Sequence, residues 1–251
     1  MDPLATLGCL DDEDIRLDLA ALELAAADRI RPDLGGPHLL LDALAARLPG
    51  HIRGAAARAE ALAGLLGQSE GFTGDTDDYD NQRNADFISV LERRRGLPVS
   101  LAVLYVSIAR RHGWAAQVLG LPGHVLVAVG GDAERVLIDP FNDGRVVPPT
   151  AGAARSDAAQ LLDNRQTLIR LTMNQTSRAM QNGDEGRALT LYRRLTLVAP
   201  GYPDLWWERA RLEQRAGDKD AARRSLAAMR ETTHDPELEG RIRAAFEMLT
   251  R

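Results

Sequence analysis

The sequence predicts an α+β fold with a helical N-terminal part, a small core that holds a short antiparallel sheet, and a helical C-terminal tail. Three observations predict it: apolar residues at helical spacing over 12–70, three short β-branched segments over 115–140, and a repeat beyond about residue 158. The chain has 251 residues, of which 45% are hydrophobic and 4% aromatic. We therefore expect a substantial core packed largely by alanine and leucine.

The N-terminal part contains three amphipathic patterns. The segment DDEDIRLDLAALELAAADR (11–29) begins with acidic residues, which suit a helix start because they oppose the helix dipole. Pro32 and the Gly-Gly-Pro run at 35–37 end this helix. HLLLDALAARLPG (38–50) and IRGAAARAEALAGLLG (52–67) predict two more helices.

The segment GFTGDTDDYDNQRN (71–84) is rich in glycine, aspartate and asparagine, and we expect a loop. Its alternating acids are also found in calcium loops. An EF-hand loop needs glycine at its sixth position and glutamate at its twelfth, and counted from Asp75 these positions hold Asp80 and Asp86. Turn formation and helix capping therefore explain the acids better than a metal site.

The central region changes from helix to strand. A helix is expected over 85–95, followed by a break at Gly96 and a second helix that Pro98 opens and Gly113 ends. AAQVLG, HVLVAVG and RVLIDP, together spanning 115–140, predict three strands, the last two joined as a hairpin by GGDAE.

The tail carries an internal repeat. Gly183-Asp184 and Gly217-Asp218 lie 34 residues apart, which is the tetratricopeptide period. Flanking helices at 159–181 and 236–250 would cover the ends, because such repeats bury their faces against neighbours. The positions that follow this register are Ala188 with Ala222, Tyr192 with Leu226, Leu195 with Met229, and Pro200, Trp206 and Ala210. The tail therefore resembles tetratricopeptide repeats.

Three polar residues could serve as a nucleophile, a base and the group that orients the base. Ser100 lies in the first turn of a helix, His124 begins a strand, and Asp139 ends the next strand. If the strands pair, His124 and Asp139 become neighbours, as a base and the group that orients it. Structural alternatives stay open: Ser100 satisfying backbone donors, a structural His124, and a turn at Asp139-Pro140.

Three motifs together carry a family resemblance. ERRRGLPVSLAVLYVSIARR, GLPGHVLVAV and IDPFNDG, preceded by the loop at 71–84, resemble the bacterial "SirB one" family. The resemblance implies a papain/transglutaminase-like core followed by tetratricopeptide-like helices. In active transglutaminase-like enzymes, a nucleophilic cysteine occupies the position of Ser100, His124 matches the base and Asp139 matches its orienter.

Serine is the departure from that pattern. A cysteine thiolate can be stored beside an imidazolium, whereas a serine hydroxyl needs concerted base removal and a formed oxyanion hole. The resemblance therefore implies a degenerate triad. We expect a non-catalytic cytoplasmic adaptor or regulator; the alternative is a Ser-His-Asp hydrolase or amidase acting on peptide-like amides. A structural oligomerisation module is weaker, since it would not need the polar trio.

The expected organisation is a helical subdomain at 1–70, a transglutaminase-like core at 71–155 and helical repeats at 156–251. The loop at 71–84 and the turn at 141–144 are expected to wall a groove for a peptide or protein partner. Candidate contacts are Asn81, Asn84, Tyr192, Trp206 and Trp207.

The composition argues against several other functions. A net charge of −5 without a basic patch disfavours nucleic acid. The single cysteine, Cys9, excludes a disulfide within the chain, and neither a cofactor nor a metal is expected. No signal peptide or long apolar stretch is recognisable, so the sequence predicts a cytoplasmic protein of bacterial type without a membrane partner.

Overall fold

The computed structural model describes residues 2–131, 134–148 and 159–250. Contacts divide the chain into one compact unit of Asp11–Leu171, called here the core unit, and another of Met1–Leu10 with Thr172–Arg251, the helical unit. The predicted α+β class is confirmed. The three-part division stays a prediction, and its boundary at 155–156 lies outside the described residues.

The helices of the core unit lie largely where the sequence places them. They are η1 (Asp12–Asp14), α2 (Leu17–Ala26), α3 (Gly35–Ala46), α4 (Ala55–Leu62), the π-helical segment η2 (Ala63–Ser69), η3 (Gln82–Ala85), α5 (Phe87–Arg93) and α6 (Pro98–Arg111). The helix expected over 11–29 is divided between η1 and α2. The Asp12 carboxylate accepts hydrogen bonds from the backbone N–H of Asn164 and Arg165, so it caps a different helix.

The sheet has five strands in the order β6-β5-β4-β3-β7, all antiparallel. Its strands are β3 (Ala116–Leu121), β4 (His124–Val129), β5 (Val136–Asp139), β6 (Arg145–Val147) and β7 (Gln160–Leu162). The three predicted strands are present and β4 pairs with β5, although residues 132–133 of the expected hairpin lie outside the described residues.

Strand β7 occupies the start of the region, 159–181, for which the sequence predicts a helix. Helix α7 (Asn164–Gln181) begins only after it. Asp163 and Gln166 form a reciprocal cap, in which each side chain accepts a hydrogen bond from the other residue's backbone N–H. This cap fixes the helix start and leaves Gln160–Leu162 to pair with β3.

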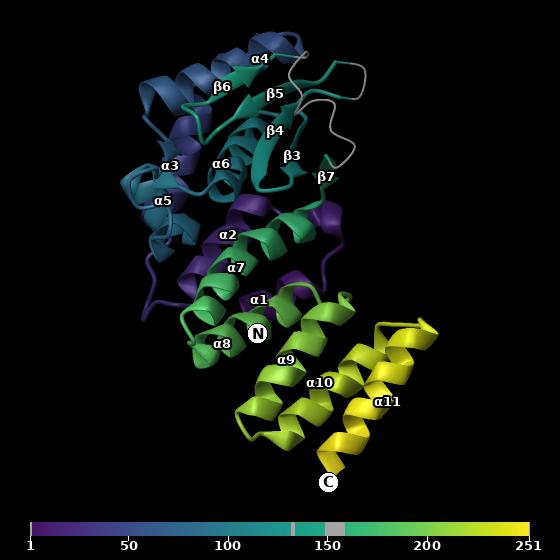
Figure 1. Cartoon of the computed structure of the whole chain (residues 1–251). Coiled ribbons are helices and arrows are strands. Elements are labelled where there is room, and N and C mark those ends of the chain that lie inside the picture. The colour runs from purple at the N-terminus through teal and green to yellow at the C-terminus, as the bar shows by residue number, and fades with distance from the viewer. Residues whose placement is uncertain (1, 132–133, 149–158, 251) are drawn as a thin grey trace. The chain divides into compact units, whose positions relative to one another are not determined.

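Helix α6 forms the centre of the core unit. It packs against β3 and β4, and every residue from Pro98 to Ala109 is buried (Figure 1). Its N-terminal end adjoins a two-stranded parallel pair, in which β1 (Thr73–Gly74) runs beside β2 (Arg95–Gly96). The loop that begins at residue 71 is thereby fastened to the start of α6.

The helical unit contains α1 (Pro3–Gly8), the end of α7, and four further helices that pack in sequence order (Figure 1). These are α8 (Glu185–Val198), α9 (Pro203–Arg215), α10 (Lys219–Glu231) and α11 (Pro236–Thr250). Within the described residues, no helix combines the length and apolarity needed to cross a membrane.

The 34-residue sequence period recurs in the turns of the helical unit. Gly183 and Gly217 both have positive φ angles, of 73° and 82°. Asp184 and Asp218 then cap the next helices, each accepting from the backbone N–H three residues ahead. The in-phase alanines Ala188, Ala210 and Ala222 are all buried. The same turn is therefore built twice, one period apart.

Candidate functional site

His124 and Asp139 meet at one end of the β4–β5 pair. His124 is the first residue of β4 and Asp139 the last of β5. The distance from His124 Nε2 to Asp139 Oδ2 is 3.0 Å, which is a hydrogen bond. The predicted neighbourhood of these two residues is therefore present in the structure.

The Asp139 carboxylate is buried and surrounded by donors. Besides His124, it accepts hydrogen bonds from the backbone N–H of Phe141 and Asn142 and from the Asn142 amide, at 3.2, 3.3 and 2.7 Å. Burial alone would raise the pKa of Asp139, but the hydrogen bonds from His124 and Asn142 outweigh it and hold the pKa below its ordinary value. Asp139 is thus ionised at neutral pH.

An ionised carboxylate can only accept hydrogen bonds, so His124 Nε2 carries the proton in the neutral ring. Nδ1 is then an acceptor, and it has no hydrogen-bond partner in the described part of the chain. The side chain is 31% exposed. Arg170 Nη2 donates to the backbone carbonyls of Leu121 and His124, and so fixes the turn that precedes β4. The arrangement can present one oriented imidazole nitrogen to a ligand.

The Ser100 hydroxyl contacts backbone groups. Ser100 is fully buried, and its hydroxyl lies 2.7 Å from the Asn84 carbonyl oxygen and 3.0 Å from that of Leu97. Across the described residues, no hydrogen bond joins Ser100 to His124. From the sequence, one alternative was that Ser100 accepts hydrogen bonds from backbone N–H groups. In the structure its hydroxyl instead donates to backbone carbonyl oxygens. Of the three predicted triad residues, His124 and Asp139 are the two that are joined by a hydrogen bond.

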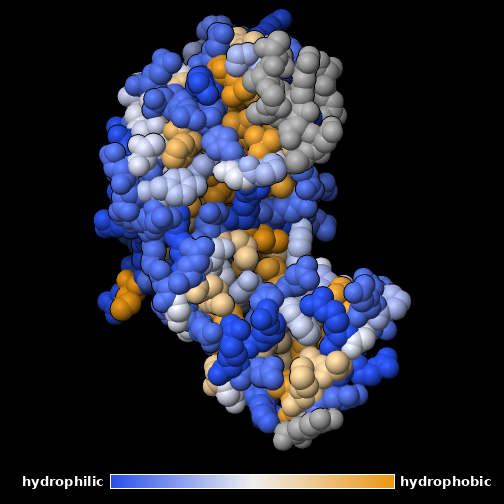
Figure 2. All heavy atoms as spheres, in the orientation of Figure 1, coloured by the Kyte–Doolittle hydropathy of each residue, from blue (hydrophilic) through white to orange (hydrophobic). Residues whose placement is uncertain are grey.

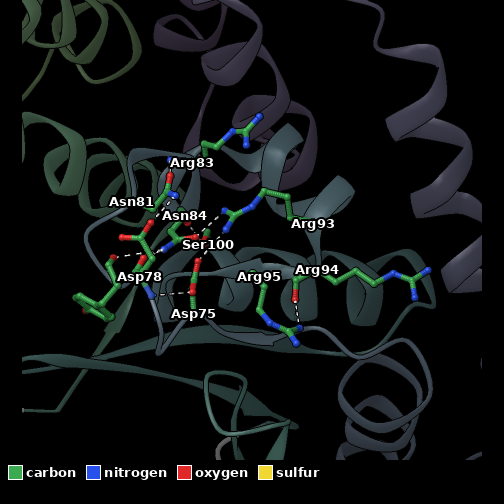
Figure 3. Close-up of polar contacts among 10 residues, drawn as sticks. Asp75, Asp78, Asn81, Arg83, Asn84, Arg93, Arg94, Arg95 and Ser100 are labelled. Atoms are coloured by element: carbon green, nitrogen blue, oxygen red, sulfur yellow. Dashed lines mark hydrogen bonds and ion pairs between the residues drawn. The ribbon is translucent and has the colours of Figure 1, made fainter.

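Ser100 belongs to a polar network that holds the loop at 71–84. Arg93 donates to the Asn84 side-chain oxygen and pairs with Asp75, both at 2.8 Å. The Asn84 amide donates to the Asp78 carbonyl at 2.8 Å. Figure 3 shows the side chains of Arg93, Asp75 and Asn84 pointing toward one another around Ser100. From the sequence, Arg93 belongs to a short arginine run expected on a solvated helix face; its partners Asn84 and Asp75 lie 9 and 18 positions away, so no local pattern reveals them.

The two predicted asparagine contacts lie in this loop. Asn84 is fully buried and its amide is engaged by Arg93 and Asp78, so it serves the loop itself. Asn81 is half-buried; its amide donates to Asp78 and accepts from the Arg83 N–H. Of the two, Asn81 is nearer to solvent.

Aromatic rings connect the loop to the His124–Asp139 pair. The Phe141 ring meets Tyr79 edge-on with centroids 5.9 Å apart, and His124 with centroids 6.4 Å apart. A Cβ on Gly74 would lie 2.5 Å from the Phe141 ring, so the backbone approaches the ring as only glycine allows. Tyr79 is 44% exposed. The turn that carries Phe141 therefore lies beside His124, and the loop lies against that turn through Gly74 and Tyr79.

The three predicted contact residues of the helical unit differ in how exposed they are to solvent. Tyr192 is buried, and burial raises its pKa. Trp206 is partly buried and its indole N–H donates to the Pro200 carbonyl at 2.7 Å. Trp207 lines a pocket of about 160 Å³ with apolar residues of α10 and α11, and Arg241 lies 4.5 Å from its ring centre. Figure 2 shows apolar side chains at the surface beside the end of α11.

Comparisons with known proteins place the chain in a family. Residues 18–178 match the model of the transglutaminase-like superfamily. A UPF0162 protein from Xylella fastidiosa is 30% identical over 243 residues, which cover 88% of this chain and 85% of that protein. A UPF0162 protein from Vibrio cholerae is 37% identical over 98 residues, which cover 39% of this chain and 36% of that one.

Comparison with solved structures shows a shared fold. The crystal structure of menin, described as revealing its binding site for the Mixed Lineage Leukemia protein, matches with a TM-score of 0.50 at 12% identity. The match covers 90% of this chain and 68% of menin. Identity this low shows a common fold and nothing further. The extent of the family match and of the relationship to the Xylella protein shows that the chain belongs to the transglutaminase-like superfamily and to the UPF0162 proteins.

Proposed function

We propose that this protein is a non-catalytic, cytoplasmic member of the transglutaminase-like superfamily that binds a peptide or protein partner as an adaptor or regulator. One observation carries the proposal: the Ser100 hydroxyl is buried and lies within hydrogen-bond distance of two backbone carbonyl oxygens. A nucleophile must reach the substrate and a base, and this hydroxyl instead stabilises the contact between loop and helix.

The proposed binding edge consists of Tyr79, His124 and Phe141. His124 offers Nδ1 as an acceptor, which suits the N–H of an extended peptide, and the exposed Tyr79 ring supplies apolar surface beside it. Asn81 lies in the same loop as Tyr79 and adds a polar group close to solvent. These groups are suited to binding a peptide backbone and do not include a nucleophile that could cleave it.

The helical unit supplies the second proposed surface. We take its repeated turns to be tetratricopeptide-like, in keeping with the "SirB one" resemblance of the motifs. The Trp207 pocket is large enough for one apolar side chain of a partner.

The test has two arms. A fluorophosphonate probe should leave Ser100 unlabelled in wild-type protein, and any esterase activity of the preparation should persist in Ser100→Ala. Labelling at Ser100 together with hydrolysis lost in Ser100→Ala would replace the binding proposal with a serine hydrolase.

For binding, peptides are selected from a displayed random library on the wild-type protein and measured by fluorescence polarisation. His124→Ala and Tyr79→Ala should each weaken a selected peptide at least tenfold. Leu39→Ala, an exposed residue of α3, serves as the control that leaves binding unchanged. If all variants bind the peptide with equal affinity, the proposed binding edge is not where the peptide binds.

A further inference from the structure

A large cavity opens in the core unit apart from the His124–Asp139 pair. It encloses about 860 Å³, which falls in the size range of small-molecule sites. Its walls come from η1, the start of α2, α3, the end of α6, β3 and the start of α7. None of the residues discussed for the peptide edge lines it.

One polar group on its α6 wall lacks the hydrogen-bond partner that burial normally demands. Ser107 is 3% exposed, and within the described residues its hydroxyl has no hydrogen-bond partner. A helical serine commonly donates to the carbonyl four residues earlier, and a buried hydroxyl without any partner costs about 1–3 kcal/mol. Such a group calls for a partner, and this one borders the cavity.

Arg110 lies one turn beyond Ser107 on the same face of α6. Its guanidinium donates to the Ala116 carbonyl at 2.9 Å and to the Asn164 side-chain oxygen at 2.6 Å, both neutral acceptors. Among the described residues it forms no ion pair, in contrast to Arg111, which pairs with Asp18 and Asp42. Burial lowers the pKa of Arg110, whereas the charges of Asp12 and Asp18 oppose that shift. A partly desolvated cation thus adjoins the cavity without a direct counter-ion.

The wall at the start of η1 and α7 has the opposite sign. Glu13 is exposed and has no ion-pair partner in the described part of the chain. Asp163 uses one carboxylate oxygen to cap α7 through the Gln166 N–H. Both line the cavity with Arg110 and Ser107. The cavity therefore offers hydrogen-bond donors on one wall and carboxylates on another.

We infer that this cavity binds a small zwitterion, with its carboxylate on Arg110 and Ser107 and a cationic group toward Glu13 and Asp163. A simple anion would be repelled by the carboxylates, and a simple cation would leave Ser107 without a hydrogen-bond partner and Arg110 without a counter-ion. A basic amino acid, free or at the carboxyl end of a short peptide, carries both groups. The inference does not depend on the proposed peptide edge.

Isothermal titration calorimetry on the full chain tests this at fixed ionic strength. The probes are L-arginine, L-lysine and the dipeptide Gly-L-arginine; agmatine, which lacks the carboxylate, and glutarate, which lacks the cation, are the matched comparisons. At least one zwitterion should bind, and agmatine and glutarate should bind at least tenfold more weakly. The dipeptide distinguishes a free amino acid from a peptide end.

The variants locate the site. Arg110→Gln should abolish binding, Ser107→Ala should weaken it several-fold, and Arg95→Gln, an exposed arginine elsewhere in the core unit, should leave it unchanged. Ser107→Ala removes a hydroxyl without a partner, so it should fold at least as stably as wild type and decides the matter if Arg110→Gln does not fold. The inference is wrong if none of the three zwitterions binds, if agmatine or glutarate binds equally well, or if Ser107→Ala retains full affinity.

Discussion

Replacing Ser100 with alanine separates an architectural serine from a nucleophile. The substitution removes one hydroxyl and leaves its two acceptors in place. Neither acceptor is orphaned, because Asn84 O also accepts the Leu97 N–H and Leu97 O also accepts the Leu101 N–H, each at 3.0 Å. The loss is therefore one net hydrogen bond, about 1 kcal/mol, without the larger penalty of an unsatisfied carbonyl.

The assay is urea denaturation of wild type and Ser100→Ala. We expect the free energy of unfolding to fall by roughly 0.5–1.5 kcal/mol, seen as a lower midpoint at unchanged slope. An unchanged midpoint, combined with loss of a hydrolytic activity, would show that the hydroxyl serves chemistry and that the structural reasoning is wrong.

Ser100→Cys gives a second measurement of the same environment. A Cβ on Gly96 would lie 2.7 Å from the serine oxygen, so the space around it is tight and a larger sulfur should cost about 1–3 kcal/mol. In a Cys9→Ser background, the buried thiol should react with iodoacetamide at neutral pH at least tenfold more slowly than the exposed Cys9 of wild type. If the thiol of Ser100→Cys reacts fast and His124→Ala slows the reaction, His124 activates the thiol and the structural reasoning is wrong.

Three further predictions follow from particular contacts. Arg29 holds both oxygens of Asp86 at 2.7 Å, so Arg29→Ala should lower stability by about 1–2 kcal/mol; Asp86→Ala should cost more in the same melts, since Asp86 also caps α5 through the Ser89 N–H. The pKa of Asp139 is depressed in the folded state, so its stabilisation is complete above the ordinary value of about 3.9 and is lost as the pH falls through the folded value; the stability difference between wild type and Asp139→Asn should shrink below about pH 4. Ala222 is 1% exposed, so Ala222→Leu should overpack the helical unit and cost roughly 1–3 kcal/mol in thermal melts, whereas Leu at the exposed Ala216 should change stability little.

The elements that the sequence predicts well are those specified by neighbouring residues. Pro98 and the apolar run behind it determine α6, and alternation with bounding glycines determines β3, β4 and β5. The meeting of His124 and Asp139 follows because adjacent strands bring their ends together. Local pattern suffices wherever the interacting groups lie within a hairpin.

The missed features depend on distant partners. Strand β7 exists because Leu162 pairs with Val118, across 44 positions, and three residues carry too little pattern to identify a strand alone. The orientation of Ser100 depends on Asn84, 16 positions earlier. The cavity joins Asp12 to Asn164, 152 positions apart, and no motif links them. These arrangements follow from packing, which a single sequence does not specify.

His124 and Asp139 also have an architectural role. Asp139 accepts the backbone N–H groups of Phe141 and Asn142 and so fixes the turn that carries Phe141. The Phe141 carbonyl accepts the Gly74 N–H at 2.9 Å and the Thr73 hydroxyl at 3.3 Å, while its ring lies against Gly74.

Ser100 and Asp139 therefore hold opposite ends of the same segment. Ser100 and Arg93 hold Asn84 at the end of the loop, and Asp139, through Phe141, holds its beginning at Thr73 and Gly74. His124 supplies one of the donors that satisfy the buried Asp139 carboxylate. Each of the three polar residues thus has a structural role that requires no reaction: Ser100 and Asp139 hold the loop, and His124 satisfies the Asp139 carboxylate.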